Sequence, residues 1–318
     1  RSLQAYAHLI NAFSGMMELE RQGSADARAS NLQAADVLAG AHAFGSICAA
    51  LLRRGRTGKG AFIDVSMLEG QMSLLNIMIS AFLADGEVQT KEMLVLDSPV
   101  MTTGMYERFI AIPDTSAQVI DCTFDLPKPG SGGRALRDAL VRIREEAAKA
   151  VKAGVENIIL SDELVSETRA AMPIILCVGG VQTHLVSKGL RSSCSIIVRS
   201  AECLDTHYFA VLIGAGATAI NAYMAQDALM DRVNRGLLDI SADEAVAQYK
   251  KAIEAGLLKI ISKMGISVIS SYRGGNNFEA LGLSRALVGE YFPGMTSRIS
   301  GIGLAGLETK LTEAHERA

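Results

Sequence analysis

The 318-residue sequence lacks an excess of charge of either sign. It holds 31 Lys and Arg against 34 Asp and Glu, for a formal net charge of -3. No run of Lys or Arg interleaved with aromatic residues occurs along the chain. Nucleic acids and anionic lipids are bound by such basic surfaces. The composition therefore predicts no nucleic-acid partner and no membrane-surface partner.

The sequence also lacks paired cysteines, long apolar runs and a leader segment. None of its five cysteines forms a C-x-x-C pair, and most lie in apolar runs, which is typical of reduced, buried thiols in the cytoplasm. No apolar run reaches the roughly 18 residues that a membrane helix needs. The chain starts at Arg1 without a charged-then-apolar leader. We therefore expect a cytoplasmic fragment of a longer protein.

What the sequence does contain is enough apolar material for one large domain or two. It is 49% hydrophobic and 20% charged, the profile of a globular protein with a sizeable core. Residues 1–86 favour helices. An Ala- and Leu-rich helix is predicted over residues 36–54, a short strand over 61–67 and a second helix over 68–83.

From residue 119 onward, short apolar runs alternate with amphipathic helical patterns. Helices are predicted over residues 135–153 and 241–256, the second opened by a capping pattern of Ser241 and Glu244. Strands are predicted over residues 119–124, 157–162, 173–178, 195–200, 217–222 and 266–271. This alternation is typical of a parallel sheet. The predicted fold class is α/β: a helical first segment, a junction at 87–92, then an α/β unit with a largely parallel sheet and crossover helices.

The first segment carries the motifs AADVLAG (34–40), ALLRRGRTGKG (50–60) and IDVSMLEG (63–70). In this order they resemble the class III CoA-transferase family, which includes formyl-CoA and carnitine CoA-transferases. The resemblance implies a homodimer, a CoA thioester as substrate, and Asp36 as the nucleophile that forms a mixed anhydride and then an aspartyl-CoA thioester. The simpler interpretation is that Asp36 is the N-cap of its helix, since Asp is a preferred capping residue.

The second segment, about residues 91–318, carries much longer motifs. They include VIDCTF (119–124), GLRSSCSIIVRSAECLDTHYFAVLIGAGATAINAY (189–223) and GLLKIISKMGISVISSYRGGNNFEALGLS (256–284). These runs resemble the large subunit of glutamate synthase. The resemblance implies a central domain at 93–260, with a structural and ammonia-tunnel role in making glutamate from glutamine and 2-oxoglutarate. It also implies a linker into an FMN barrel at 261–318, and a small-subunit or ferredoxin partner.

Four adjacent residues are the candidate flavin-side edge of this segment: Ser262, Lys263, Met264 and Gly265. Lys263 beside a glycine could face a phosphate, but the same pattern describes an ordinary helix C-terminus. His184 and His207 are candidates for the carboxyl edge of the sheet, and neither has a partner at metal-ligand spacing. We predict no metal and no cofactor bound by this chain, whereas the whole family uses FMN and an iron–sulfur cluster.

Three functional hypotheses follow from these patterns. The first is a glutamate synthase large-subunit fragment that is inactive alone. The second is an acyl-CoA transferase that acts through Asp36. The third is an inert chimera of two gene fragments, in which neither catalytic machinery is complete.

Overall fold

The chain forms two compact units, Arg1–Val95 and Leu96–Ala318. The computed structural model describes residues 34–74, 96–113, 115–127 and 130–317. The predicted junction at residues 87–92 lies outside these ranges. The predicted division near residue 260 falls inside a helix, Ala242–Lys263, and it stays a prediction.

The first unit contains two described helices, α3 (Ala34–Thr57) and α4 (Met67–Leu74). They pack where Gly70 approaches Leu38, whose Cβ lies 3.7 Å from the place a Cβ on Gly70 would occupy. The expected helix over residues 36–54 is therefore confirmed and is slightly longer. The expected strand over residues 61–67 is wrong, because this stretch has no strand partner and leads directly into α4.

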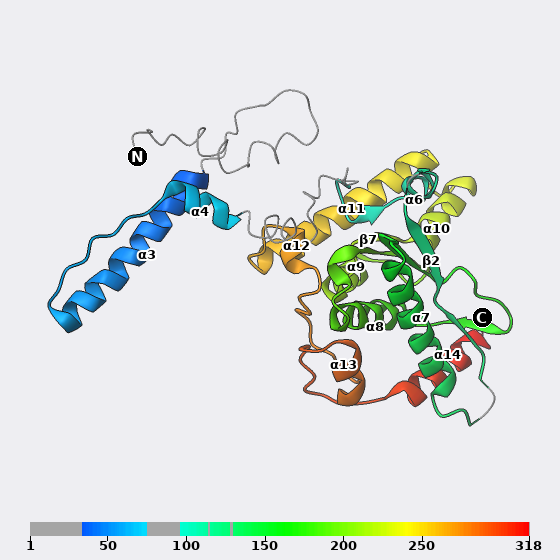
Figure 1. Ribbon diagram of the computed structural model, residues 1–318. Coiled ribbons are helices and arrows are strands. Elements are labelled where there is room, and N and C mark those ends of the chain that lie inside the picture. Colours follow the sequence, from blue (N-terminus) through cyan, green and yellow to red (C-terminus); the bar gives the residue numbers. More distant parts are fainter. Residues whose placement is uncertain (1–33, 75–95, 114, 128–129, 318) are drawn as a thin grey trace. The chain divides into compact units, whose positions relative to one another are not determined.

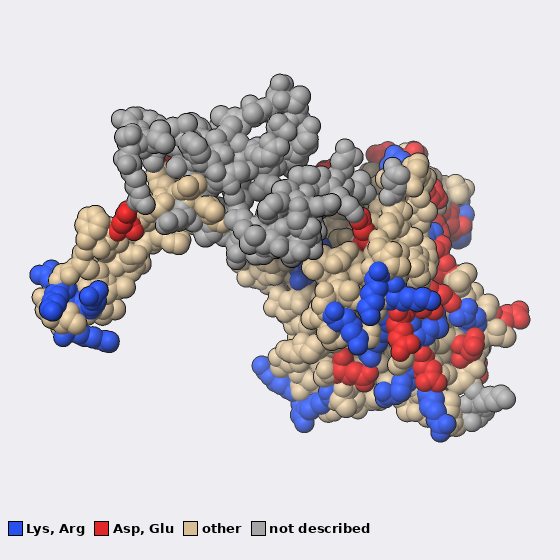
Figure 2. Space-filling view, in the orientation of Figure 1, with Lys and Arg blue, Asp and Glu red and all other residues tan. Residues whose placement is uncertain are grey.

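Helix α3 exposes most of its apolar side chains. Phe44 is 71% exposed, Leu51 is 57% exposed and Ile47 is 49% exposed, whereas Ala35 is fully buried. Among the described residues, α3 is the one helix whose length and composition would allow it to cross a membrane, and the expectation of no such stretch is wrong by this test. Basic side chains gather at its far end (Figure 2), where Arg54 and Arg56 occupy the last turn.

The second unit is built on a five-stranded parallel sheet (Figure 1). Its strand order is β1-β7-β6-β4-β2, and each neighbouring pair is parallel. A separate antiparallel pair joins β3 to β5. The strands are β1 (Val100–Met101), β2 (Ala117–Asp121), β3 (Thr123–Asp125), β4 (Asn157–Ser161), β5 (Arg169–Ala171), β6 (Ser195–Arg199) and β7 (Ala219–Asn221). The predicted α/β fold with crossover helices is confirmed.

Helix α7 (Arg134–Lys152) shows why this layer forms. Its apolar residues recur at three- and four-residue spacing, so Leu136, Leu140, Ile143 and Val151 fall on one buried face. The central strands β4 and β6 are buried at three or four consecutive positions, as expected when helices and side chains cover both faces of a parallel sheet. Burying one such Leu or Ile contributes about 1.5–3 kcal/mol.

Two predicted strands are helices instead. Residues 173–178 begin α8 (Ile174–Ser187), and residues 269–271 belong to the short helix α12 (Ile269–Tyr272). Helix α8 lies in the centre of the core, with buried residues on all its sides. A helix that is apolar all round carries no 3.6-residue periodicity. Pro173 and the first five residues of α8 therefore looked like a buried strand.

The remaining elements complete two layers. Helices α7, α8 and α9 (Thr206–Ala215) lie in the core on one side of the sheet, whereas α6 (Thr103–Ile110) packs against the second, smaller cluster. Helix α13 (Arg285–Tyr291) packs on α8, and α14 (Leu304–His315) packs on α7 (Figure 1). The rest are a 3-10 turn at Arg191–Ser193, α10 (Tyr223–Asn234) and α11 (Ala242–Lys263).

Candidate functional site

Polar residues collect at the carboxyl edge of the three central strands. Ser161, Arg199 and Asn221 are the last residues of β4, β6 and β7, and the strand register pairs them directly across the sheet. Asp162 and Ser200 follow at once. Because ligands of open α/β sheets bind outside this edge, it is the first place to look for a site.

Asp162 is the buried centre of this edge. It is only 1% exposed. Its carboxylate accepts hydrogen bonds from Ser200 Oγ at 2.6 Å, from the Ala201 amide at 3.0 Å and from Tyr223 Oη at 3.0 Å. Burial raises the pKa of Asp162 above its usual 3.8, and these hydrogen bonds offset only part of that effect. The residue thus fixes β4 to the turns that follow β6 and β7.

Arg199 fills the space between two tyrosine rings. Its guanidinium carbon lies 4.4 Å from the ring centre of Tyr106 and 5.0 Å from that of Tyr223. Its Nη2 donates to Glu163 Oε1 at 2.7 Å, and its Nη1 donates to Asn221 Oδ1 at 2.5 Å. The hydrogen bond from Arg199 lowers the pKa of Glu163. A guanidinium suits this place because it pairs and stacks at the same time.

Glu202 extends the network to the start of α8. Its carboxylate accepts from the Ile174 amide and from Tyr208 Oη, both at 2.8 Å. The helix begins after Pro173, which offers no side-chain cap, so Glu202 satisfies an amide at that end. Burial raises the pKa of Glu202, and it also raises the pKa of Tyr208.

The chemistry open to this edge is limited by access. Ser200 donates to Asp162 as a nucleophile would to its base. Ser200 is fully buried, however, so no substrate can reach its oxygen. The ionisable groups Asp162, Glu163, Arg199 and Glu202 are all bonded to other groups of the chain. The arrangement is that of a polar network whose groups bind one another and the backbone within the described residues.

The sequence-predicted residues lie elsewhere. Asp36 is exposed in the first turn of α3, in the first unit. Ser262 and Lys263 end α11 in the second unit, Met264 is its C-cap, and Gly265 follows with a φ of 70°. These four adjacent residues therefore occupy a helix C-terminus, and the structure assigns Asp36 to a different unit.

A flavin phosphate would need converging N–H donors or cations. The end of α11 presents carbonyl oxygens, and Lys263 alone adds an exposed positive charge there. As placed in this chain, residues 262–265 do not form a phosphate cradle.

The two histidines lie near the ends of their helices. His184 lies in the last turn of α8, and burial together with Lys188 and Arg144 lowers its pKa. His207 lies in the first turn of α9, with its ring edge-on to Phe278 at 6.2 Å. Within the described residues, no group of three or more His, Cys, Asp or Glu could hold a metal ion.

The edge residues were missed in the sequence, although a signal for them exists. In NIILSDE, SIIVRSAE and ATAINAY, polar residues follow directly after a buried apolar run. Carboxyl ends of parallel strands meet at one edge, so these three polar groups must come together. Reading the ends of strands, rather than isolated histidines, would have found Asp162, Arg199 and Asn221.

Comparison with known proteins identifies two families along the chain. The model of the glutamate synthase central domain matches residues 71–284, and that of CoA-transferase family III matches residues 1–107. Both predicted resemblances are therefore confirmed. The first match includes every strand of the second unit and the whole carboxyl edge of the sheet.

Curated relatives agree with the larger match. The chain is 55% identical over 238 residues to the glutamate synthase [NADPH] large chain of Azospirillum brasilense, covering 74% of this chain and 15% of that protein. It is 40% identical over 230 residues to the corresponding chain of Bacillus subtilis (70% and 14%). It is 38% identical over 221 residues to a ferredoxin-dependent glutamate synthase of Arabidopsis thaliana (66% and 14%). The chain thus spans about a seventh of the length of these relatives.

Proposed function

The chain belongs to the glutamate synthase central domain family, and we propose that its second unit performs the structural work of that domain within a large chain that makes glutamate from glutamine and 2-oxoglutarate. The observation that carries the proposal is the closed network at the carboxyl edge. Asp162, Arg199 and Glu202 bind other groups of the chain, and the two serines of this edge that donate to carboxylates, Ser161 and Ser200, are both buried. Such an edge supports a structural role better than it supports a reaction.

A graft tests this role. The segment of the Azospirillum brasilense large chain that matches this protein is replaced by the segment of this chain, and three quantities are measured: glutamine consumed, glutamate formed and ammonia released. If the proposal holds, glutamate forms and little ammonia escapes. A graft that folds and consumes glutamine, but releases its ammonia to solution, would contradict the tunnel-wall role.

An edge variant of the graft sharpens the test. Arg199→Gln removes the group that holds Glu163, Asn221 and two tyrosine rings together. It is expected to increase ammonia release relative to glutamate formation. Arg235→Gln is the matched control, because Arg235 is exposed and its side chain, within the described residues, pairs with Asp231 one helical turn earlier.

Cofactors and partners are proposed at the level of the whole large chain. FMN and an iron–sulfur cluster would act in segments other than this one, with residues 261–318 leading toward the flavin region. The relatives include both NADPH and ferredoxin-dependent enzymes. Either a small subunit or ferredoxin would supply electrons, in the cytoplasm, and the present chain alone is expected to make no glutamate.

A second function is favoured by the CoA-transferase match at residues 1–107. We propose Asp36 as an acyl acceptor, since it is exposed in the first turn of α3, where the helix dipole stabilises a carboxylate. The chain is incubated with several acyl-CoAs and trapped with hydroxylamine. Mass spectrometry then compares the peptide that contains residue 36 in the wild type and in Asp36→Asn. Modification of residue 36 in the wild type, but not in Asp36→Asn, would establish acyl transfer to Asp36. The homodimer that the CoA-transferase resemblance implies would then be tested next.

Helix α3 begins at Ala34, so Asp36 lies inside its first turn and the simpler interpretation of Asp36 as the N-cap is wrong. An unmodified peptide would leave Asp36 with the role of a carboxylate near the helix N-terminus, and would favour the third hypothesis, an inert chimera. Continuous sequencing reads across codons 85–95 test that reading directly. Reads that never cross the junction would indicate that the two segments were joined artificially.

A further inference from the structure

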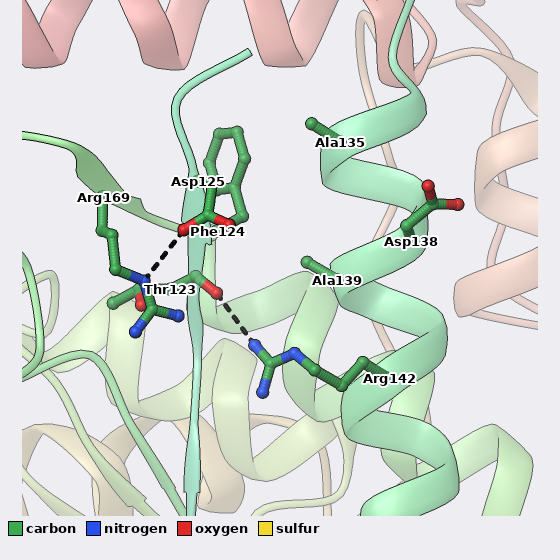
Figure 3. Close-up of a pocket in the computed structure, with 8 residues that line it drawn as sticks. All are labelled: Thr123, Phe124, Asp125, Ala135, Asp138, Ala139, Arg142 and Arg169. Carbon is green, nitrogen blue, oxygen red and sulfur yellow. Dashed lines mark hydrogen bonds and ion pairs between the residues drawn. The ribbon is translucent and has the colours of Figure 1, made fainter.

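A cleft of about 330 Å³ lies between the β3–β5 pair and helix α7 (Figure 3). One wall is the strand pair, with Thr123, Phe124, Asp125 and Arg169. The other wall is one face of α7, formed by Ala135, Asp138, Ala139 and Arg142. The small side chains of Ala135 and Ala139 stand where larger residues would close the space. Cavities that bind small molecules begin at about this volume.

Both arginines of the cleft are fixed in place. Arg142 Nη2 donates to the carbonyl oxygens of Asp121 and Thr123, both at 2.9 Å (Figure 3 shows the Thr123 contact). Arg169 Nη2 lies 2.6 Å from Asp121 Oδ2. Arg142 Nη1 also lies 3.6 Å from Glu146 Oε2, so both ends of that guanidinium group are engaged, whereas the contact with Asp121 uses one end of Arg169. A pre-positioned guanidinium loses little freedom when it binds a carboxylate.

The pair between Arg169 and Asp125 is the weak contact of the cleft. Arg169 Nε lies 3.4 Å from Asp125 Oδ1, and this buried nitrogen makes no hydrogen bond within the described part of the chain. The side chain of Asp125 is 90% exposed, so it can turn away without disturbing the core. Exposed ion pairs of this kind contribute little. A ligand can therefore separate the two groups at small cost.

The lining also balances charge. Arg142 is paired with Glu146, and Arg169 is held by Asp121. The weak pair therefore offers a ligand one positive group, Arg169, and one negative group, Asp125, whereas Asp138 lies on the outer side of α7 (Figure 3). A dianion would be repelled by the aspartates, and a dication would be repelled by the arginines. A neutral molecule that carries one charge of each sign avoids both conflicts.

We propose that this cleft binds a small zwitterionic α-amino acid, which enters between Arg169 and Asp125. Its carboxylate replaces Asp125 beside Nε of Arg169, and its ammonium group binds the Asp125 carboxylate that has turned away. Asp121 keeps Arg169 in position, and the side chain of the ligand lies along Ala135 and Ala139. Neither the family role of the chain nor its acyl-transfer candidate requires this site.

Isothermal titration of the full 318-residue chain tests the site with three probes of similar length: L-glutamine as the zwitterion, glutarate as the dianion and 1,5-diaminopentane as the dication. L-glutamine is expected to bind saturably, and the other two at least tenfold more weakly. Asp125→Asn and Arg169→Gln should each weaken L-glutamine binding tenfold or more. Ala135→Leu should abolish it by filling the cleft, and Arg235→Gln should leave it unchanged.

Three results would overturn the proposal. The first is that L-glutamine does not bind at concentrations up to about 10 mM, which is ten times the Kd that corresponds to a binding free energy of roughly 4 kcal/mol. The second is that glutarate binds as strongly as L-glutamine. The third is that Ala135→Leu binds L-glutamine as strongly as the wild type does. Circular dichroism checks that each variant is folded. If Arg169→Gln does not fold, Asp125→Asn still decides the matter, because that side chain is 90% exposed.

Discussion

Glu308 of helix α14 caps a helix that lies far away in the sequence. Its side chain is buried, with 3% of the residue exposed. Oε1 accepts from the Gly133 amide at 3.0 Å and from the Ser131 hydroxyl, and Oε2 accepts from the Leu136 amide at 2.9 Å. Helix α7 begins after Gly133, which has no side chain to act as a cap. The free amides of α7 therefore depend on Glu308.

Replacing Glu308 by alanine should cost about 3 kcal/mol of unfolding free energy. Each buried amide left without a partner costs about 1–3 kcal/mol, and a carboxylate at a helix N-terminus contributes roughly 0.3–2 kcal/mol through the dipole. These contributions overlap, so their full sum would be too large. Glu308→Gln keeps one acceptor oxygen but loses the charge, and should cost about half as much.

The effect should depend on pH in a defined direction. Burial alone would raise the pKa of Glu308, but the amides of Leu136 and Gly133 and the Ser131 hydroxyl together lower it below its usual 4.5. A depressed folded-state pKa gives stability that is fully present above the unfolded value and is lost as pH falls through the folded value. The difference between wild type and Glu308→Gln should therefore shrink below about pH 4.

Urea unfolding followed by near-ultraviolet tyrosine circular dichroism isolates the second unit. The chain has no tryptophan, and six of its seven tyrosines lie in residues 96–318. Glu313→Ala is the control, because Glu313 is an exposed residue of the same helix. It should change stability by less than about 0.5 kcal/mol. A loss that small for Glu308→Ala would refute the capping argument.

Three further outcomes are expected of the second unit. In a carbon-13 titration, Asp162 should have a pKa above the ordinary value for aspartate, and Glu163 should have a pKa below the ordinary value for glutamate. The stability that Asp162 contributes is therefore present at low pH and is lost as pH rises through its folded-state pKa. Arg199→Lys should cost about 1–2 kcal/mol in urea unfolding, because lysine can neither stack nor bond through two nitrogens; an unchanged midpoint would count against this. Gly179→Ala should lower the unfolding free energy by about 1–3 kcal/mol in thermal melts, since the new Cβ would lie 2.8 Å from the Tyr291 carbonyl oxygen. Gly289→Ala should raise the unfolding free energy by up to about 1 kcal/mol, because its new Cβ would meet no atom of another residue within 4 Å among those described.

Elements with a strong local pattern were predictable. The helix expected over residues 135–153 is α7, at Arg134–Lys152, and the strand expected over residues 195–200 is β6, at Ser195–Arg199. Ser241 caps α11 through a hydrogen bond from the Glu244 amide, as its spacing indicated. In each case the information lies within a few neighbouring residues. Periodicity and capping are properties of that range.

The errors arose where burial removed the pattern. Helix α8 is apolar on every side, so its first residues gave the same signal as a strand. Helix α3 shows the opposite case, because its position and length were predicted, yet its apolar residues Phe44 and Leu51 are exposed. Spacing indicates which residues share a side of a helix. It does not indicate whether anything in the chain covers that side.

The candidate site was beyond local reasoning for a different reason. Ser200 and Tyr223 lie 38 and 61 residues after Asp162 in the sequence, yet both donate hydrogen bonds to its carboxylate. The sequence marks each of them as the polar residue that ends a buried run. Only the strand order β7-β6-β4 makes those ends neighbours. Resemblance to a family predicts which sheet the chain forms. Which polar residues come together at the edge of that sheet follows from the order of its strands. The sequence analysis did not use that order, and it proposed residues 262–265 as the candidate site.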